Sequence, residues 1–243
     1  MSEKPTGYYD LVERFPASGC AVCRLVLRDG ERSLKSLMHE YVMDFDTQAD
    51  FRRSRGLCNH HAWWLSGARN ALGVAKLYSA ALDEIINTLD SVTDDGQRTL
   101  FSRLLNGDGN RSALADALRQ KKPCPVCALQ SANEARYLKT LCKYIKDERM
   151  NTAYRASDGL CLTHFRGALN AAPSAATHTE LVTIQRDIWH RLYAELNEFM
   201  RKSDVYVNEN FGEEGDSWLR TIASLGGLSG VFGVDRQRDD DGD

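Results

Sequence analysis

Cysteine and histidine residues occur in this chain at a spacing that suits metal binding. The segment CPVC is followed after 33 residues by CLTH, which supplies four donors: Cys124, Cys127, Cys161 and His164. Residues three apart on a helix lie on one face, with Cβ atoms about 5–6 Å apart, so each pair can grip one ion. Three thiolates and one imidazole form the closed tetrahedral shell of a structural zinc site.

The same pattern occurs earlier in the chain. GCAVC and GLCNHH, with 34 residues between the two ligand pairs, supply Cys20, Cys23, Cys58 and His61. The CxxC segments are 104 residues apart and the CxxH segments 103 apart, and other positions match at these offsets, such as Val22 with Val126 and Arg32 with Arg136. This periodicity predicts an internal duplication.

The predicted domains follow from the duplication. A first helical metal-binding repeat is expected over 1–106 and a second over 107–204, with the turn-rich stretch LNGDGNRS at 105–112 as the boundary. The segment 205–243 is expected to hold one short helix, from about 213 to 225, and the acidic tail DRQRDDDGD, expected to be disordered.

The sequence leaves the pairing of the ligand pairs open. Each repeat could build its own site, or Cys20 and Cys23 could share a metal with Cys161 and His164. Because a duplicated unit would once have functioned alone, the local arrangement is preferred. It places Cys20, Cys23, Cys58 and His61 in one site and Cys124, Cys127, Cys161 and His164 in the other.

The repeat also sorts the remaining candidate ligands. Cys142 aligns with Met38 on an apolar helix face, which indicates a small core residue. His60 aligns with Thr163, so His61, at the CxxH spacing, is the preferred ligand.

Apolar residues recur at helical spacing through most of the chain, which predicts an all-α fold. One helix of about 25 residues is expected after His61, with its apolar stripe at Leu65, Ala68, Leu72, Ala75, Leu82, Ile85 and Leu89. The corresponding helix of the second half should break near Pro173. Pro125 suits a first helical turn, and the glycines before Cys58 and Cys161 suit sharp entry into the next helix.

Zinc is the metal that three cysteines and one histidine suit best, and an iron–sulfur cluster is the alternative. A thioredoxin-like role for CPVC lacks the surrounding βαβ pattern. A catalytic zinc keeps one position open, whereas all four are filled here, so two structural ions per chain are expected. No GxSxG, P-loop or HExxH motif points to an enzyme, although a metalloenzyme using the carboxylates of ENFGEEGDSW is a third alternative.

Composition narrows the remaining function classes. With 31 basic and 34 acidic residues the formal charge is −3, which gives no basic excess for a nucleic-acid partner. No segment is long and apolar enough to span a membrane, and the N-terminus has no signal-peptide character, so a cytoplasmic protein is expected. The favoured function is a non-enzymatic scaffold or adaptor that binds another protein.

The whole pattern resembles the uncharacterised bacterial family DUF6062 over roughly residues 8–227. The resemblance is carried by CPVC, GLCLTH, GCAVC, GLCNHH and the C-terminal RKSDVYVNENFGEEGDSW. It implies a bacterial cytosolic protein and identifies no substrate. It also directs interest to a possible partner surface in the C-terminal segment, formed by Arg201, Lys202, Asp204, Glu214, Asp216 and Trp218.

Overall fold

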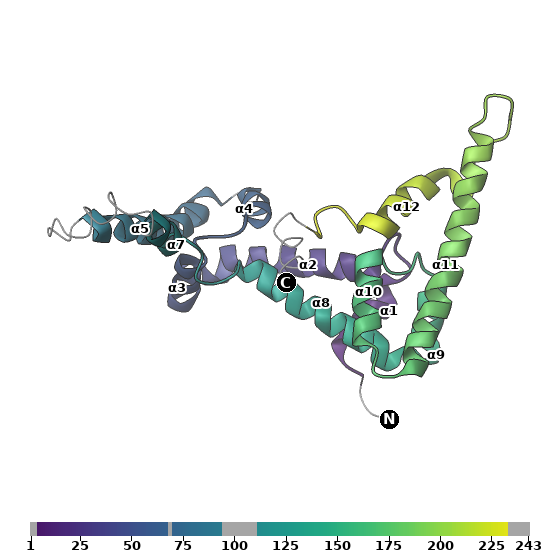
Figure 1. Ribbon diagram of the computed structural model, residues 1–243, viewed down its shortest axis with the longest axis horizontal. Helices are drawn as coiled ribbons and strands as arrows, with labels where there is room; N and C mark the ends of the chain where they lie inside the picture. Colours follow the sequence, from purple (N-terminus) through teal and green to yellow (C-terminus); the bar gives the residue numbers. More distant parts are fainter. Residues whose placement is uncertain (1–3, 68–69, 94–110, 233–243) are drawn as a thin grey trace. The chain divides into compact units, whose positions relative to one another are not determined.

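The computed structural model describes residues 4–67, 70–93 and 111–232, and within these ranges it is helical without any strand (Figure 1). The predicted all-α class is confirmed. None of the described helices is long and apolar enough to cross a membrane. The elements are α1 (Thr6–Arg14), α2 (Ala21–Ser36), the π-helix η1 (Leu37–Tyr41), α3 (Phe45–Arg53), α4 (Asn59–Ser66), α5 (Ala71–Thr93), α7 (Arg111–Ala117), α8 (Pro125–Tyr144), α9 (Glu148–Arg155), α10 (Leu162–Ala171), α11 (Ala175–Lys202), the 3-10 helix η2 (Glu213–Asp216) and α12 (Ser217–Gly226).

The chain divides into two compact units. Unit 1 comprises Met1–Asp29 and Gln130–Asp243, and unit 2 comprises Gly30–Leu129. Both boundaries fall inside long helices, α2 and α8, so each of these helices contributes residues to both units. These units differ from the predicted repeats 1–106 and 107–204. The turn-rich stretch at 105–112 lies almost wholly outside the described residues.

Unit 1 has a continuous apolar core that helices from both ends of the chain build together. Tyr8 and Leu11 of α1 are buried beside Tyr137 of α8 and Ile184 of α11. A buried polar group fixes the packing of α2 on α8, because Asp29 accepts hydrogen bonds from Tyr137 Oη at 2.7 Å and Asn133 Nδ2 at 2.9 Å. This carboxylate is therefore satisfied although it lies in the core.

Unit 2 has its own smaller core. Leu34 and Met38 pack with Phe51 of α3 and with Leu65 and Leu77 from the helices that follow. The ring of Phe51 meets Tyr78 edge-on at 5.1 Å, which fastens α3 to α5.

The prediction of one long helix after His61 is wrong. The structure has two helices, α4 and α5, and α5 is capped by Asn70, whose side chain accepts a hydrogen bond from Gly73 N at 3.0 Å. Much of the predicted core stripe also points outward, since Leu72 is 69% and Leu82 57% exposed.

Two other helix predictions agree with the structure. In the second half, α10 ends at Ala171 and α11 begins at Ala175, so the break near Pro173 is confirmed, with Ser174 capping α11. The short C-terminal helix predicted from about 213 to 225 is formed by η2 and α12. The tail predicted to be disordered lies outside the described residues.

Gln185 gives a test of the unit 1 core. Its side chain is fully buried, accepts hydrogen bonds from Tyr154 Oη and Leu160 N, and donates one to Leu160 O. Replacing it by alanine leaves these groups without partners, so Gln185→Ala should lower the free energy of unfolding by about 3 kcal/mol. Urea denaturation followed by circular dichroism measures this.

The matched control is Asn197→Ala, which removes an exposed amide from the same helix and should change stability by less than about 0.5 kcal/mol. Equal stabilities for the two variants would contradict the assigned role of Gln185.

Candidate metal centres

Four helix starts carry the predicted ligands, all in the same way. The carbonyl groups of Cys20, Cys58, Cys124 and Cys161 each accept a hydrogen bond from the backbone N–H four residues later, so each cysteine lies at an N-cap. The second residue of each pair then lies at the third helical position. Side chains at these two positions of a helix start can meet, as they do in a capping box. Free N–H groups and the helix dipole at such a start also favour thiolates.

Two glycines explain how the chain enters α4 and α10. Gly56 and Gly159 precede the N-cap cysteines by two residues and have φ values of +91° and +79°. Residues with a Cβ rarely adopt this conformation, so the predicted sharp turns need glycine at these positions. Pro125 occupies the first position of α8, as predicted.

The first set of donors lies entirely in unit 1 and joins the start of α2 to the start of α10. Cys20, Cys23, Cys161 and His164 are all at most 2% exposed. The sulfurs of Cys23 and Cys161 are 3.7 Å apart, and His164 Nδ1 lies 3.2–3.4 Å from the three sulfurs. All four donor atoms lie within 4.8 Å of one another.

The second set lies entirely in unit 2 and joins the start of α4 to the start of α8. Cys58 and Cys127 have their sulfurs 3.6 Å apart, and His61 Nδ1 lies 3.2–3.7 Å from the sulfurs of these two residues and of Cys124. Here too the four donor atoms lie within 4.8 Å of one another. In contrast to the first set, Cys58 and Cys127 are only half-buried.

These distances match those of a shell around one small ion. With Zn–S bonds of about 2.3 Å and Zn–N bonds of about 2.0–2.1 Å, a regular tetrahedron places two sulfurs about 3.8 Å apart and a sulfur and a nitrogen about 3.6 Å apart. Three sulfurs and one imidazole nitrogen therefore could hold a metal ion in each unit.

The predicted pairing within each repeat is wrong, because the structure combines the pairs across the halves. Cys20 and Cys23 meet Cys161 and His164, whereas Cys58 and His61 meet the second CxxC. The boundaries of the units explain this pairing. Cys20 and Cys23 lie at the unit 1 end of α2, and α2 continues into unit 2, where Cys58 and His61 lie, so the two pairs of the first half belong to different units.

Electrostatics within the buried set oppose the accumulation of negative charge. Burial disfavours ionisation of Cys20, but hydrogen bonds from Cys161 and Cys23 and the charge of His164 lower its pKa well below the usual value. Hydrogen bonding to Cys161 and Cys20 raises the pKa of Cys23, because a second thiolate beside the first is unfavourable. A bound cation would remove this conflict and allow all three thiols to ionise.

The unit 2 set shows the same division. Hydrogen bonds from Cys127 and Cys58 lower the pKa of Cys124, and the same close contacts raise the pKa of Cys127. Burial acts to lower the pKa of His61, but hydrogen bonds to Cys124 and Cys58 outweigh it and raise the value to about 9.

One residue beside the first set escaped the sequence analysis. Glu134 Oε1 lies 3.2 Å from His164 Nε2, the ring nitrogen that faces away from the sulfurs. Carboxylates at this position orient metal-binding imidazoles and raise their basicity. No spacing rule identifies Glu134, because it lies on α8 and the repeat matches it with Gly30.

The remaining predicted roles can be placed. His61, and not His60, joins the sulfurs, and Trp64 stacks on the His61 ring at 6.0 Å while Trp63 is 72% exposed. Cys142 is buried, donates a hydrogen bond to Ala168 O and has its pKa raised by burial to about 11, as a core residue should.

Three carboxylates of the C-terminal segment form ion pairs with cations of α11 and α12. Glu209 pairs with Arg201 and Glu214 with Lys202, at 2.5 and 2.8 Å. Asp216 pairs with Arg220 at 2.7 Å. Among the described residues they form no group that could hold a metal, because the two Cys/His sets are the only such groups there.

One known protein family matches this sequence over nearly its whole length. A family model described as "Family of unknown function (DUF6062)" matches residues 10–230. The chain belongs to this family. No curated protein and no solved structure matches the chain. The DUF6062 match spans both donor sets and the C-terminal helix, so the sites described here lie inside the family region.

Metal stoichiometry can test the exchanged pairing. The double variant Cys23→Ser/Cys161→Ser changes one donor set twice, so it should lose one metal ion per chain and keep the other. The double variant Cys23→Ser/Cys58→Ser changes both sets and should lose both ions. Elemental analysis of the purified soluble proteins measures the difference.

A matched control is Cys142→Ser, which changes the buried cysteine outside both sets and should keep both ions. If Cys23→Ser/Cys161→Ser lost both ions and Cys23→Ser/Cys58→Ser lost only one, the ligands would instead be paired within each repeat.

Proposed function

We propose that this DUF6062 protein is a zinc-binding helical scaffold, with one structural Zn²⁺ in each compact unit, that acts by binding another protein. The proposal is carried by one observation: three sulfurs and one imidazole nitrogen lie within 4.8 Å of one another in each unit. The residues that would hold the ions are Cys20, Cys23, Cys161 and His164 in unit 1, and Cys58, His61, Cys124 and Cys127 in unit 2.

A structural role follows from the number and burial of the donors. Four protein ligands fill a tetrahedral shell, so they leave no position for a substrate. The set in unit 1 is also completely buried, and the ring of Phe232 lies 5.3 Å from that of His164. Binding free energy of order 10 kcal/mol for each ion would be comparable to the whole stability of a small domain.

Zinc is favoured over an iron–sulfur cluster by the spacing of the sulfurs. A cluster distributes its four protein ligands over two or more irons, so ligands on different irons lie far apart. In each set all four donor atoms lie within 4.8 Å of one another, which suits a single ion. A metalloenzyme using the C-terminal carboxylates is not favoured, since Glu209, Glu214 and Asp216 are paired with cations.

We also infer that the chain arose by internal duplication followed by exchange of helices between the halves. The match in sequence extends to local hydrogen bonding. Asp44 and Asp147, 103 residues apart, each cap the following short helix through a side-chain oxygen. Ser54 and Ser157, also 103 apart, each donate to the carbonyl three residues earlier.

The adaptor role is supported by an exposed apolar surface in unit 1. On α12 the side chains of Trp218, Leu219, Ile222 and Leu225 are 46–59% exposed. Beside them is an apolar groove of about 310 Å³ lined by Leu162, Trp189, Leu192, Tyr193, Leu196, Thr221, Ser224 and Leu225.

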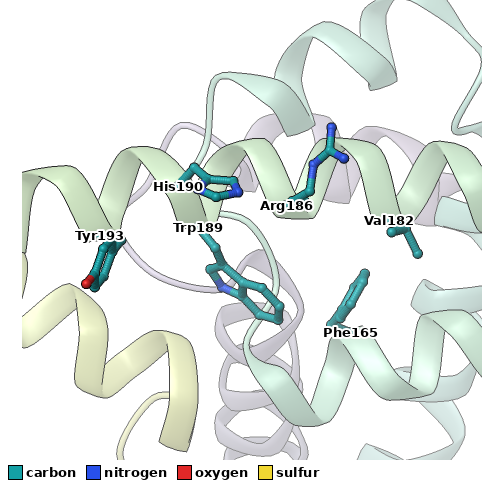
Figure 2. Close-up of a pocket in the computed structure, with 6 residues that line it drawn as sticks. All are labelled: Phe165, Val182, Arg186, Trp189, His190 and Tyr193. Carbon is teal, nitrogen blue, oxygen red and sulfur yellow. The ribbon is translucent and has the colours of Figure 1, made fainter.

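A second hollow continues along α11. It has a volume of about 400 Å³ and is lined by Phe165 of α10 and Trp189 of α11, whose side chains lie next to each other in Figure 2. Their ring centres are 5.3 Å apart and the rings meet edge-on. Exposed apolar patches of this kind are typical of protein interaction sites.

The metal is tested by purifying the chain without oxygen or added metal. Zinc should be found at two ions per chain in a colourless protein, and a chelator should remove the ion bound by half-buried Cys58 and Cys127 before the ion in the buried set. Release of zinc to the chelator, followed by the absorbance of the zinc–chelator complex, should therefore show two phases. The Cys58→Ser variant should lack the fast phase and Cys161→Ser the slow one.

Iron with absorption near about 400 nm would replace the zinc proposal by the iron–sulfur alternative. Protein that folds with full helicity and binds no metal would end the metal proposal altogether.

The partner surface is tested by affinity capture with the tagged full chain. Ile222→Asp places a charge in the exposed α12 stripe, so it should reduce recovery of the bound protein at least roughly 10-fold. Phe45→Asp is the matched control, because Phe45 is 78% exposed in unit 2 and lies outside this surface. Equal recovery with wild type, Ile222→Asp and Phe45→Asp would remove the α12 surface from the proposal.

A further inference from the structure

Helix α5 carries an apolar stripe that faces solvent. Leu72, Leu82, Ile86 and Leu89 are 69%, 57%, 45% and 40% exposed, and the small residues Ala75 and Ser79 between them are exposed as well. These six residues, named here the α5 seam, follow one another at intervals of 3, 4, 3, 4 and 3. The seam is about 25 Å long.

The α5 seam is not the face by which α5 joins its own unit. That face carries Leu77 and Ala81, which are at most 3% exposed, and α5 packs through it onto α3 and α4. At Gly73 an added Cβ would come within 2.3 Å of Met38 Cε, so α5 and Met38 are already in close contact. The core of unit 2 is therefore built without the seam.

The spacing of the seam indicates what it binds. Alternating intervals of 3 and 4 give a period of 3.5 residues, the a and d positions of a heptad, which keeps an apolar line facing a second helix. We propose that the α5 seam is a self-association surface, on which α5 of a second copy of this chain packs in antiparallel orientation.

Side-chain sizes favour the antiparallel orientation. When two α5 helices run in opposite directions about a centre between Ser79 and Leu82, large residues meet small ones. Ala75 then lies opposite Ile86, and Ser79 opposite Leu82, while Leu72 meets Leu89. Each central layer has one small and one large side chain, which allows close helix packing without a void.

A parallel pair of the same helices packs poorly. It would place Ala75 against its own counterpart and Ser79 against its own counterpart, leaving two successive layers underfilled. Voids of this kind cost free energy because the lining atoms lose contacts.

Charges along the seam favour the same orientation. Lys76 and Asp83 each follow a d residue of the seam, so both occupy e positions of the heptad. In an antiparallel pair the e positions of the two helices face each other. This brings Lys76 of one copy near Asp83 of the other, and the twofold symmetry makes the contact twice. Both residues are exposed on α5. In a parallel pair Lys76 would face Ala71 and Asp83 would face Tyr78, so neither would gain a partner.

The mass of the full-length, metal-loaded chain in solution tests the proposal. Sedimentation equilibrium should give a dimer for the wild type. Leu82→Glu should weaken the dimer at least roughly 100-fold, because it buries a charge in a central layer of the pair. The matched control is Leu225→Glu, an exposed leucine of α12 outside the seam, which should stay dimeric.

A charge exchange tests the orientation. Lys76→Glu should weaken the dimer roughly 10-fold by setting two acidic groups against each other. The double variant Lys76→Glu/Asp83→Lys should restore it, since the pair is reversed. In a parallel dimer neither change would alter the dissociation constant.

Circular dichroism and metal content, unchanged from the wild type, show that each variant is folded. A monomeric wild type, or a dimer that survives Leu82→Glu, would overturn the proposal whatever the metal content. A dimer lost with Leu225→Glu instead would move the interface to α12. The outcome is distinct from the zinc test, because association is read from mass and not from bound metal.

Discussion

The rest of this structure depends on the meeting of helix starts around a small cluster of sulfur atoms. Each set of donors lies where two helices begin, with one donor at the N-cap and one at the third helical position. Three sulfurs at this distance repel as thiolates, so the arrangement requires a cation or retained protons. The helix dipoles and free N–H groups lower that cost at both starts.

Each compact unit takes its donors from both halves of the sequence. Unit 1 takes its CxxC pair, Cys20 and Cys23, from the first half and its CxxH pair from the second. Unit 2 takes its CxxH pair, Cys58 and His61, from the first half and its CxxC pair from the second. Helix α8 carries Cys124 and Cys127 of the unit 2 set and also Glu134, which lies beside His164 of the unit 1 set. A change in α8 can therefore affect both sites.

The two donor sets differ in accessibility although their ligands are alike. All four residues of the unit 1 set are buried, whereas Cys58 and Cys127 are partly open to solvent. In the charged C-terminal segment, three carboxylates pair with Arg201, Lys202 and Arg220 of the same chain. Apolar side chains on α5 and α12, in contrast, face solvent.

By itself the sequence determined which residues are the candidate ligands, because ligand type and helical spacing are local properties. It identified the eight donors, the choice of His61 over His60 and the need for Gly56 and Gly159. Only the tertiary structure decided which pairs meet. That outcome depends on where α2 and α8 pass from one compact unit into the other, which no spacing motif records. It also decided that the stripe at Leu72 and Leu82 faces outward, because periodicity identifies an apolar face without saying what covers it.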